Sequence, residues 1–149
     1  MATLYEQLQK AKKLKPENIK RDLSKFIRSI EKQIIDKNKE QIEVDSKDIY
    51  GNAIGFYSYA TELISGGAKK QGDPFTGKDT GDWFDGFYMQ EVSGVIRLGS
   101  TDPKTNEILS SEHWLSDDLF GLSDENLSKI IEENILPFVL RNSRLILNI

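Results

Sequence analysis

Residues 16–41 read PENIKRDLSKFIRSIEKQIIDKNKEQ. Pro16 suits the first turn of a helix, where its missing N–H costs no hydrogen bond. The apolar residues that follow recur at intervals of three or four, which places them on one face of an α-helix. They are Ile19, Leu23, Phe26, Ile27, Ile30 and Ile34. One helix over residues 16–41 would be about 35–40 Å long, more than a small domain requires. The pattern therefore predicts a long amphipathic helix, part of which extends toward a neighbouring molecule.

The opposite face of this predicted helix is basic. Basic amphipathic helices are also typical of membrane-surface and nucleic-acid-binding segments. Here, however, the apolar face has no tryptophan at its edge, the whole chain has a net charge of −4, and the stretch holds one aromatic residue. We therefore expect the apolar face to pack in the core, with no membrane contact. The candidate contact residues on the basic face are Lys20, Arg21, Lys25, Arg28 and Lys32.

Capping signals predict helices on both sides of this stretch. Thr3 and Glu6 form a T-x-x-E capping box, which predicts a short helix within residues 1–15. Ser123 can cap a helix whose first turn is acidic, and an apolar stripe at helical spacing follows it. We expect a C-terminal helix and tail over residues 123–149, kinked or divided at Pro137. The apolar end of the chain should pack within the domain or on a partner.

Residues 42–122 show no long helical pattern and are interpreted as a β-rich and loop region. The segment 56–64 fits a short strand or a short helix, and residues 65–82 are glycine-rich and predict a long loop. Two runs, 83–92 and 95–100, flank Ser93-Gly94 and predict an antiparallel β-hairpin. The expected fold is one α+β domain over residues 1–149. In it, the long N-terminal helix and the C-terminal helix pack on this small sheet beside the Gly-rich loop.

Charge is distributed unevenly along the chain. Residues 10–40 contain 11 lysines and arginines against 5 aspartates and glutamates, whereas residues 73–133 contain 4 against 14. Two solvated faces of one soluble protein would explain this asymmetry. Contact between copies, basic surface on acidic surface, would explain it equally, and such complementarity guides register and encounter. Asp117 and Asp118 are the candidate contacts on the acidic side.

Composition limits where the chain works. It has no cysteine, which excludes disulfides and thiolate sites and fits a reducing compartment. No apolar run approaches the ~18 residues of a membrane helix, and the N-terminus lacks the pattern of a signal peptide. We expect a protein that stays in a cytoplasm or in a particle assembled there.

Residues that could support catalysis are few. Asp79-Thr80-Gly81 spells the aspartic-protease signature, but it follows Thr76-Gly77-Lys78 rather than a buried apolar strand, and a helix cap or turn is the simpler interpretation. His113 is the single histidine and belongs to no recognisable motif. No phosphate-binding loop is present. We therefore expect no catalytic, metal or cofactor site and no small-molecule substrate.

An aromatic cluster follows the glycine-rich segment. Trp83, Phe84 and Phe87 lie close together in the sequence, and such clusters usually belong to a core. Their size and their position after a loop also make them candidates for a subunit contact.

Several short motifs follow one another in a definite order along the chain. Asp48-Ile49-Tyr50-Gly51-Asn52 follows the long charged helix, and Gly72-Asp73-Pro74-Phe75 and Asp79-Thr80-Gly81 precede the aromatic element. Phe120-Gly121-Leu122-Ser123 then begins the last helix. In their order and spacing, over about residues 18–140, these motifs resemble those of the tail-completion and virion-morphogenesis proteins of tailed bacteriophages.

The resemblance implies an α+β subunit that forms a ring at the junction between phage head and tail. The implied partners are copies of itself, portal or adaptor proteins and tail proteins, with the basic helix a candidate to line or flank the DNA channel. A closed ring uses heterologous interfaces, so unlike complementary surfaces are expected. The alternative is a small phage-encoded binding or regulatory module that acts on a host protein.

Overall fold

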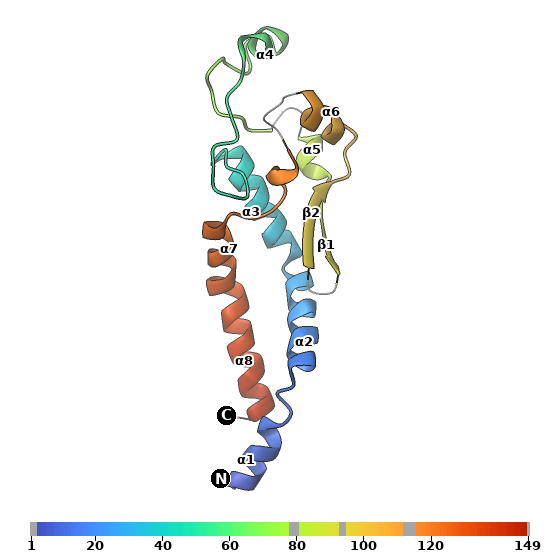
Figure 1. Ribbon diagram of the computed structural model, residues 1–149, viewed down its shortest axis with the longest axis vertical. Helices are drawn as coiled ribbons and strands as arrows, with labels where there is room; N and C mark the ends of the chain where they lie inside the picture. The colour runs from blue at the N-terminus through green and yellow to red at the C-terminus, as the bar shows by residue number, and fades with distance from the viewer. Residues whose placement is uncertain (1–2, 78–80, 93–94, 112–115, 149) are drawn as a thin grey trace.

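The computed structural model describes residues 3–77, 81–92, 95–111 and 116–148. The molecule is elongated, with the N-terminal helix at one end and α4 at the other (Figure 1). The described elements in chain order are α1 (Leu4–Ala11), α2 (Pro16–Ser29), α3 (Glu31–Glu43), α4 (Tyr59–Ile64), α5 (Asp82–Asp85), β1 (Phe87–Val92), β2 (Val95–Ser100), α6 (Lys104–Ser111), the 3₁₀ turn η1 (Asp117–Leu119), α7 (Asp124–Ile130), the π-helical turn η2 (Ile131–Ile135) and α8 (Leu136–Leu147).

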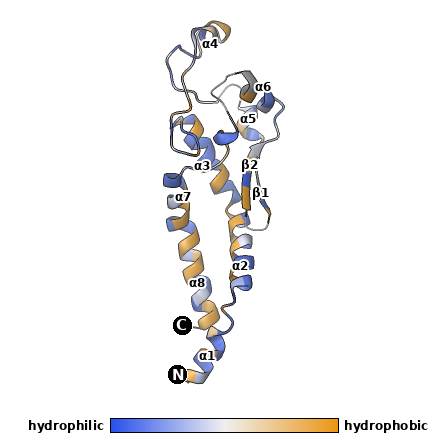
Figure 2. Ribbon diagram, viewed as in Figure 1, coloured by the Kyte–Doolittle hydropathy of each residue, from blue (hydrophilic) through white to orange (hydrophobic). Residues whose placement is uncertain are grey.

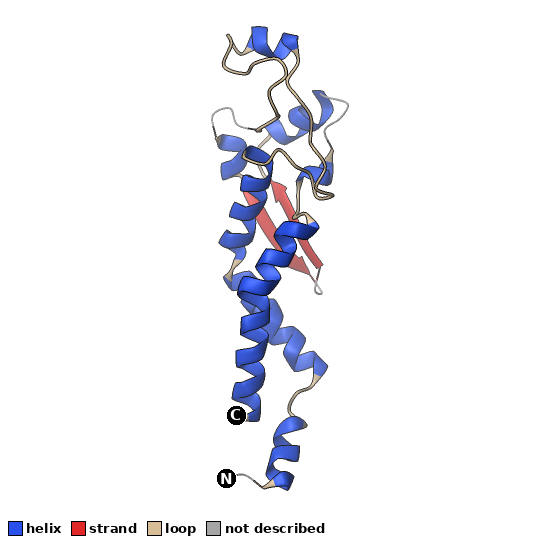
Figure 3. Ribbon diagram, turned by 90° about the vertical axis from the view of Figure 1, so that its left-hand side faces the viewer, coloured by secondary structure: helices blue, strands red, loops and turns tan. Residues whose placement is uncertain are grey.

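The predicted capping box begins α1. The Thr3 backbone N–H donates to Glu6 Oε2 at 2.8 Å, and the Glu6 N–H donates to Thr3 Oγ1 at 3.2 Å. No residue of α1 is buried. The N-terminal helix is therefore confirmed. It lies at one end of the molecule, where it contacts α8 without burying any of its own residues (Figures 1 and 3).

The prediction of one helix over residues 16–41 is wrong, because the helix breaks at Ile30. This residue has φ −104° and ψ 18°, and its N–H is shared between the carbonyls of Phe26 and Ile27. The Ser29 hydroxyl donates to the Phe26 carbonyl as well, and such local side-chain bonds compete with the helical ladder. Two helices, α2 and α3, result. Their apolar stripe does face the interior, and its members Ile30 and Ile34 are buried.

The C-terminal helices run antiparallel to α2 and α3 and lie along them (Figure 1). The predicted Ser123 cap is confirmed, since its side chain accepts from the Asn126 N–H. The division expected at Pro137 takes the form of the π-helical turn η2, which ends two residues earlier without a visible change of direction. The two helical arms are joined by stacked rings of Phe26 and Phe138, whose centroids are 4.2 Å apart.

A β-hairpin packs against α3. Strands β1 and β2 are antiparallel, with Phe87 opposite Ser100 and Val92 opposite Val95, so the hairpin prediction is confirmed. The predicted turn at residues 93–94 lies outside the described residues. The first strand is shorter than predicted, because Gly81 at φ 93° starts the helical turn α5 and strand geometry begins only at Phe87. Segment 56–64, left open by its pattern, is helical from Tyr59.

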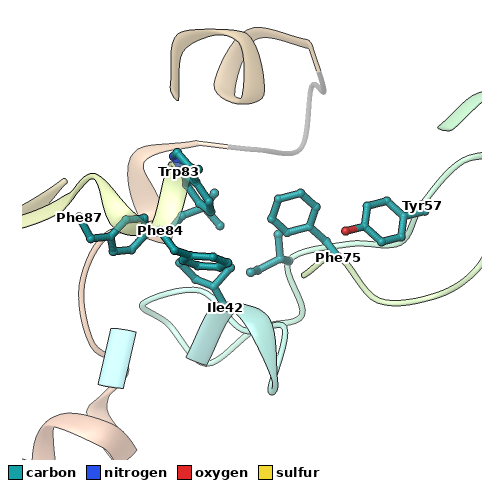
Figure 4. Packing of buried hydrophobic residues seen from close by; sticks show 8 residues of the cluster. Ile42, Tyr57, Phe75, Trp83, Phe84 and Phe87 are labelled. Atoms are coloured by element: carbon teal, nitrogen blue, oxygen red, sulfur yellow. The ribbon is translucent and has the colours of Figure 1, made fainter. Parts of the chain in front are cut away.

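Buried residues form two clusters. The head core lies near the upper end of α3 and is mainly aromatic, and Figure 4 shows its side chains gathered around Ile42. Its members are Ile42, Ile54, Tyr57, Phe75, Trp83, Phe84, Phe87 and Leu119. The stalk core is smaller: Ile30, Ile34 and Ile130 are buried there against half-buried neighbours that include Met89 and Leu98 of the hairpin. The molecule is thus α+β, with several helices and a two-stranded antiparallel sheet.

Candidate functional site

The five basic candidates are exposed, as the sequence predicts: Lys20, Arg21, Lys25, Arg28 and Lys32. Lys37 and Lys39 of α3 are half-buried. Own-chain acids neutralise several of the candidates: Lys32 Nζ lies 2.7 Å from Asp36 Oδ2, and Arg28 Nε lies 3.8 Å from Glu91 Oε2. Arg21 likewise pairs with Asp22. Within the described part of the chain, Lys20 and Lys25 have no ion-pair partner. This surface is therefore less positive than the sequence alone suggests, and its unpaired charges include Lys20 and Lys25 of α2.

The acidic candidates belong to a different part of the molecule. Asp117 and Asp118 form the turn η1, which the Ser116 side chain caps by accepting from the Asp118 N–H at 3.2 Å. In Figure 1, η1 lies beside the head end of α3, whereas α2 lies farther down the long axis. The structure therefore does not bring the predicted basic and acidic contacts together within one chain.

The prediction of a subunit contact at Trp83, Phe84 and Phe87 is wrong. Their exposed fractions are 3%, 6% and 8%, and all three belong to the head core. The Trp83 and Phe87 ring centroids are 5.0 Å apart in an edge-to-face arrangement, and Trp83 Nε1 donates to Thr105 Oγ1. Since α5 turns Trp83 and Phe84 inward and the start of β1 does the same for Phe87 (Figure 4), these rings stabilise the subunit and offer no surface to a partner.

A buried polar network holds the Phe120-Gly121-Leu122-Ser123 segment against α3. Asn38, which has no exposed surface, donates to the carbonyls of Leu119 at 2.9 Å and Gly121 at 2.7 Å. Gln41, buried to 1%, accepts from the Ser123 N–H at 2.8 Å and from Asn126 Nδ2 at 2.9 Å. Buried amides in such a network fix one arrangement, because each unpaired group would cost desolvation energy.

This network was not among the residues predicted from sequence. A signal for it existed: Asn38 stands four residues after Ile34 and four before Ile42, on the apolar stripe itself. A polar residue at such a position has to find a buried partner. The partner here lies about 80 residues farther along the chain, and periodicity alone does not identify it.

An open apolar groove lies between the hairpin and α7, and its volume is about 670 Å³. We call it the β2–α7 groove. Its buried floor includes Ile34 and Ile130. At its edges Ile96 and Leu127 are 38% and 42% exposed. Asp117 also lines it, so one of the acidic candidates lies at this groove.

Apolar side chains are also exposed at both ends of the molecule. At the N-terminal end, α1 presents Leu4 and Leu8, which are 83% and 53% exposed, together with Tyr5. At the opposite end, α4 presents Ile64, which is 89% exposed. Figure 2 shows apolar residues at these two ends and along α8. Each end therefore offers an apolar surface that the chain's own core does not cover.

Two motifs considered for catalysis lie outside the described residues. These are Asp79-Thr80 and His113. In the ranges that the structure does describe, no group of three or more histidine, aspartate or glutamate side chains could hold a metal ion. None of the helices in those ranges is long and apolar enough to cross a membrane.

No protein-family model matches the chain, no curated protein matches it, and no solved structure matches it.

Proposed function

We propose that this chain is a structural subunit that assembles with copies of itself, in a ring at the head–tail junction of a tailed phage. The observation that carries the proposal is the exposure of large apolar side chains on α1, on α4 and around the β2–α7 groove. Grouped apolar surface of this kind marks sites of protein–protein contact. The surfaces differ from one another and lie at different places on an elongated molecule, as head-to-tail contacts require.

The separation of charge supports the same proposal. Basic α2 and acidic η1 lie apart on one chain, so each is free to face the opposite surface of a neighbour (Figure 1). Complementary charge of this kind sets register and speeds encounter more than it adds affinity. Placement at the phage neck, with portal, adaptor and tail proteins as partners, rests on the sequence resemblance alone.

Two measurements test the proposal. Size-exclusion chromatography with light scattering, followed by negative-stain electron microscopy, should find oligomers larger than dimers and closed rings. Mass spectrometry of purified phage particles that encode the chain should find it at a fixed copy number. A protein that stays monomeric up to high concentration and is missing from particles would refute the proposal.

A binding module that acts on a host protein is the second candidate. The projecting α4 favours it, because Tyr59, Leu63 and Ile64 are each more than half exposed on a short helix away from the cores. This candidate predicts a monomer that captures one host protein and is absent from particles. Replacing Ile64 with glutamate should then abolish capture without changing the oligomeric state.

A further inference from the structure

We propose that helix α1 of one copy docks into the β2–α7 groove of the next copy. This inference rests on the proposed self-assembly and names its interface. It is argued from the state of α1, the shape of the groove, the charges on both and the reach of the linker between α1 and α2.

Helix α1 lacks the burial that a short helix needs. It has eight residues, none of them buried, and isolated helices of this length are marginal in water. Its capping box stabilises only the first turn. Leu4 and Leu8 stand one turn apart on the same face, with Tyr5 beside them. A covered apolar face would supply the stability that the helix otherwise lacks.

The groove suits a helix of this size. Amphipathic helices commonly bind by laying one apolar face into a hydrophobic groove. Helix α1 is about 12 Å long, and the five residues of β2 that line the groove, 96–100, extend about 17 Å. The floor is made of Ile34, Ile130 and half-buried Leu98, which matches the aliphatic side chains that α1 presents.

The lysines that follow α1 complement the acidic residues at the end of the groove beside α7. Lys10, Lys12, Lys13 and Lys15 stand at the end of α1 and in the linker, with no acidic residue among positions 9–16. Among the described residues, two charged side chains line the groove, those of Asp117 and of Arg97 in β2. Exposed Asp124 begins α7 one turn before Leu127. Helix α1 lying in the groove would bring its lysines toward these carboxylates. Docking would therefore bury the apolar face of α1, and the charge pairs would fix its position along the groove.

The chain's own α1 does not reach this groove. Linker residues 12–15 span at most about 14 Å. Ile34, on the groove floor, lies 18 residues beyond Pro16, about 27 Å along α2 and α3. Even turned back along α2, α1 would leave Leu8 short of the floor. A second copy is the occupant that the geometry allows, and repeated docking of this kind builds a ring or a chain.

Disulfide trapping between copies tests the contact directly, since the protein contains no cysteine of its own. Chains carrying Leu8→Cys are mixed with chains carrying Leu127→Cys and are oxidised under mild conditions. The expected product is the mixed dimer, identified by intact mass. Ile64→Cys replaces Leu8→Cys in the matched control, because Ile64 is even more exposed but lies at the opposite end. The control should give no excess of the mixed dimer.

Three outcomes of the trapping experiment would overturn the inference. The first is a product that contains only dimers between identical variants, linked through position 8 or through position 127. The second is an equal yield of mixed dimer in the Ile64→Cys control. The third is a disulfide within one chain when Leu8→Cys and Leu127→Cys are combined in the same chain. The first indicates a symmetric contact, the second random collision, and the third an own-chain occupant.

Association measurements supply the second arm. Leu8→Glu should raise the Kd of self-association about tenfold or more, because a buried leucine becomes a buried charge. Folding should be unchanged, since α1 contributes no buried residue. Ile64→Glu is the matched control and should leave the Kd unchanged. Lys12→Glu with Lys13→Glu should also weaken association, and Asp117→Lys with Asp124→Lys on the partner should restore it.

The two proposals fail differently. If the unmodified protein self-associates and Leu8→Glu does so equally well, the docking inference falls while the structural function stands. If the unmodified protein never self-associates, the proposed function falls and the docking falls with it.

Discussion

The head core and the stalk helices, α1, α2 and α8, differ in how far the chain itself buries their apolar side chains. In the head core, eight apolar residues are each at most 9% exposed, and the amide network of Asn38 and Gln41 lies beside them. In α1, α2 and α8 no residue is buried, although all three are amphipathic. An amphipathic pattern thus predicts that a face is covered without saying by what. We therefore expect the head core to contribute most of the subunit's stability, and the stalk helices to present apolar faces for contact with other molecules.

The largest expected effect comes from the head core. Trp83→Ala should lower the free energy of unfolding by about 3–5 kcal/mol, because a large ring that is 3% exposed leaves a cavity. Leu140→Ala on α8 is the stalk counterpart; with Leu140 49% exposed, it should cost about 1 kcal/mol or less. Urea denaturation of both variants measures the difference. Equal costs would contradict the contrast between the two regions.

The amide network should give the next largest effect. Asn38→Leu keeps the approximate volume but leaves the Leu119 carbonyl and the Gly121 N–H without their partner, at a cost of about 3 kcal/mol. Amide hydrogen exchange should rise at Gly121, because the segment is no longer held against α3. Gln33→Leu is the matched control: Gln33 accepts one exposed hydrogen bond from Asn134, so its loss should cost about 1 kcal/mol at most. If Asn38→Leu leaves the free energy of unfolding unchanged, packing alone positions residues 120–123 against α3.

Local signals in the sequence were sufficient for much of this fold. Thr3, Pro16 and Ser123 start helices where their side chains satisfy or spare backbone N–H groups, and these are contacts within one turn. The hairpin follows from two short runs around a turn. The break at Ile30 was not predictable from spacing, because the apolar stripe continues through it unchanged.

The candidate site was less predictable than the fold. Exposure of Lys20 and Lys25 follows from the polar side of the stripe, whereas the burial of Trp83 depends on the direction in which α5 points it. The β2–α7 groove is formed by residues as far apart in sequence as Ile34 and Ile130. No local pattern encodes such a surface.

Gly121 offers a smaller and more specific perturbation of the head. Its φ is 141°, and an added Cβ would stand 2.9 Å from Ile49 Cγ2. Gly121→Ala should therefore cost about 2 kcal/mol through overpacking and backbone strain. In an Ile49→Ala background the extra cost of the same change should shrink, since the clashing methyl group is absent. A double-mutant cycle by thermal denaturation measures this coupling, and strictly additive costs would mean that strain at φ 141° acts alone.

The smallest effect on the free energy of unfolding is expected at a leucine of the stalk helix α8. Leu145 lies in the last turn of α8 and is 80% exposed, so Leu145→Ser should change the free energy of unfolding by no more than about 0.5 kcal/mol. The same change should leave trapping between Leu8→Cys and Leu127→Cys intact, because Leu145 does not line the β2–α7 groove. A cost above about 1 kcal/mol in the dilute monomer would mean that α1 covers Leu145 in solution. In that case the apolar face of α1 already has an occupant on its own chain, and the groove would need a different one.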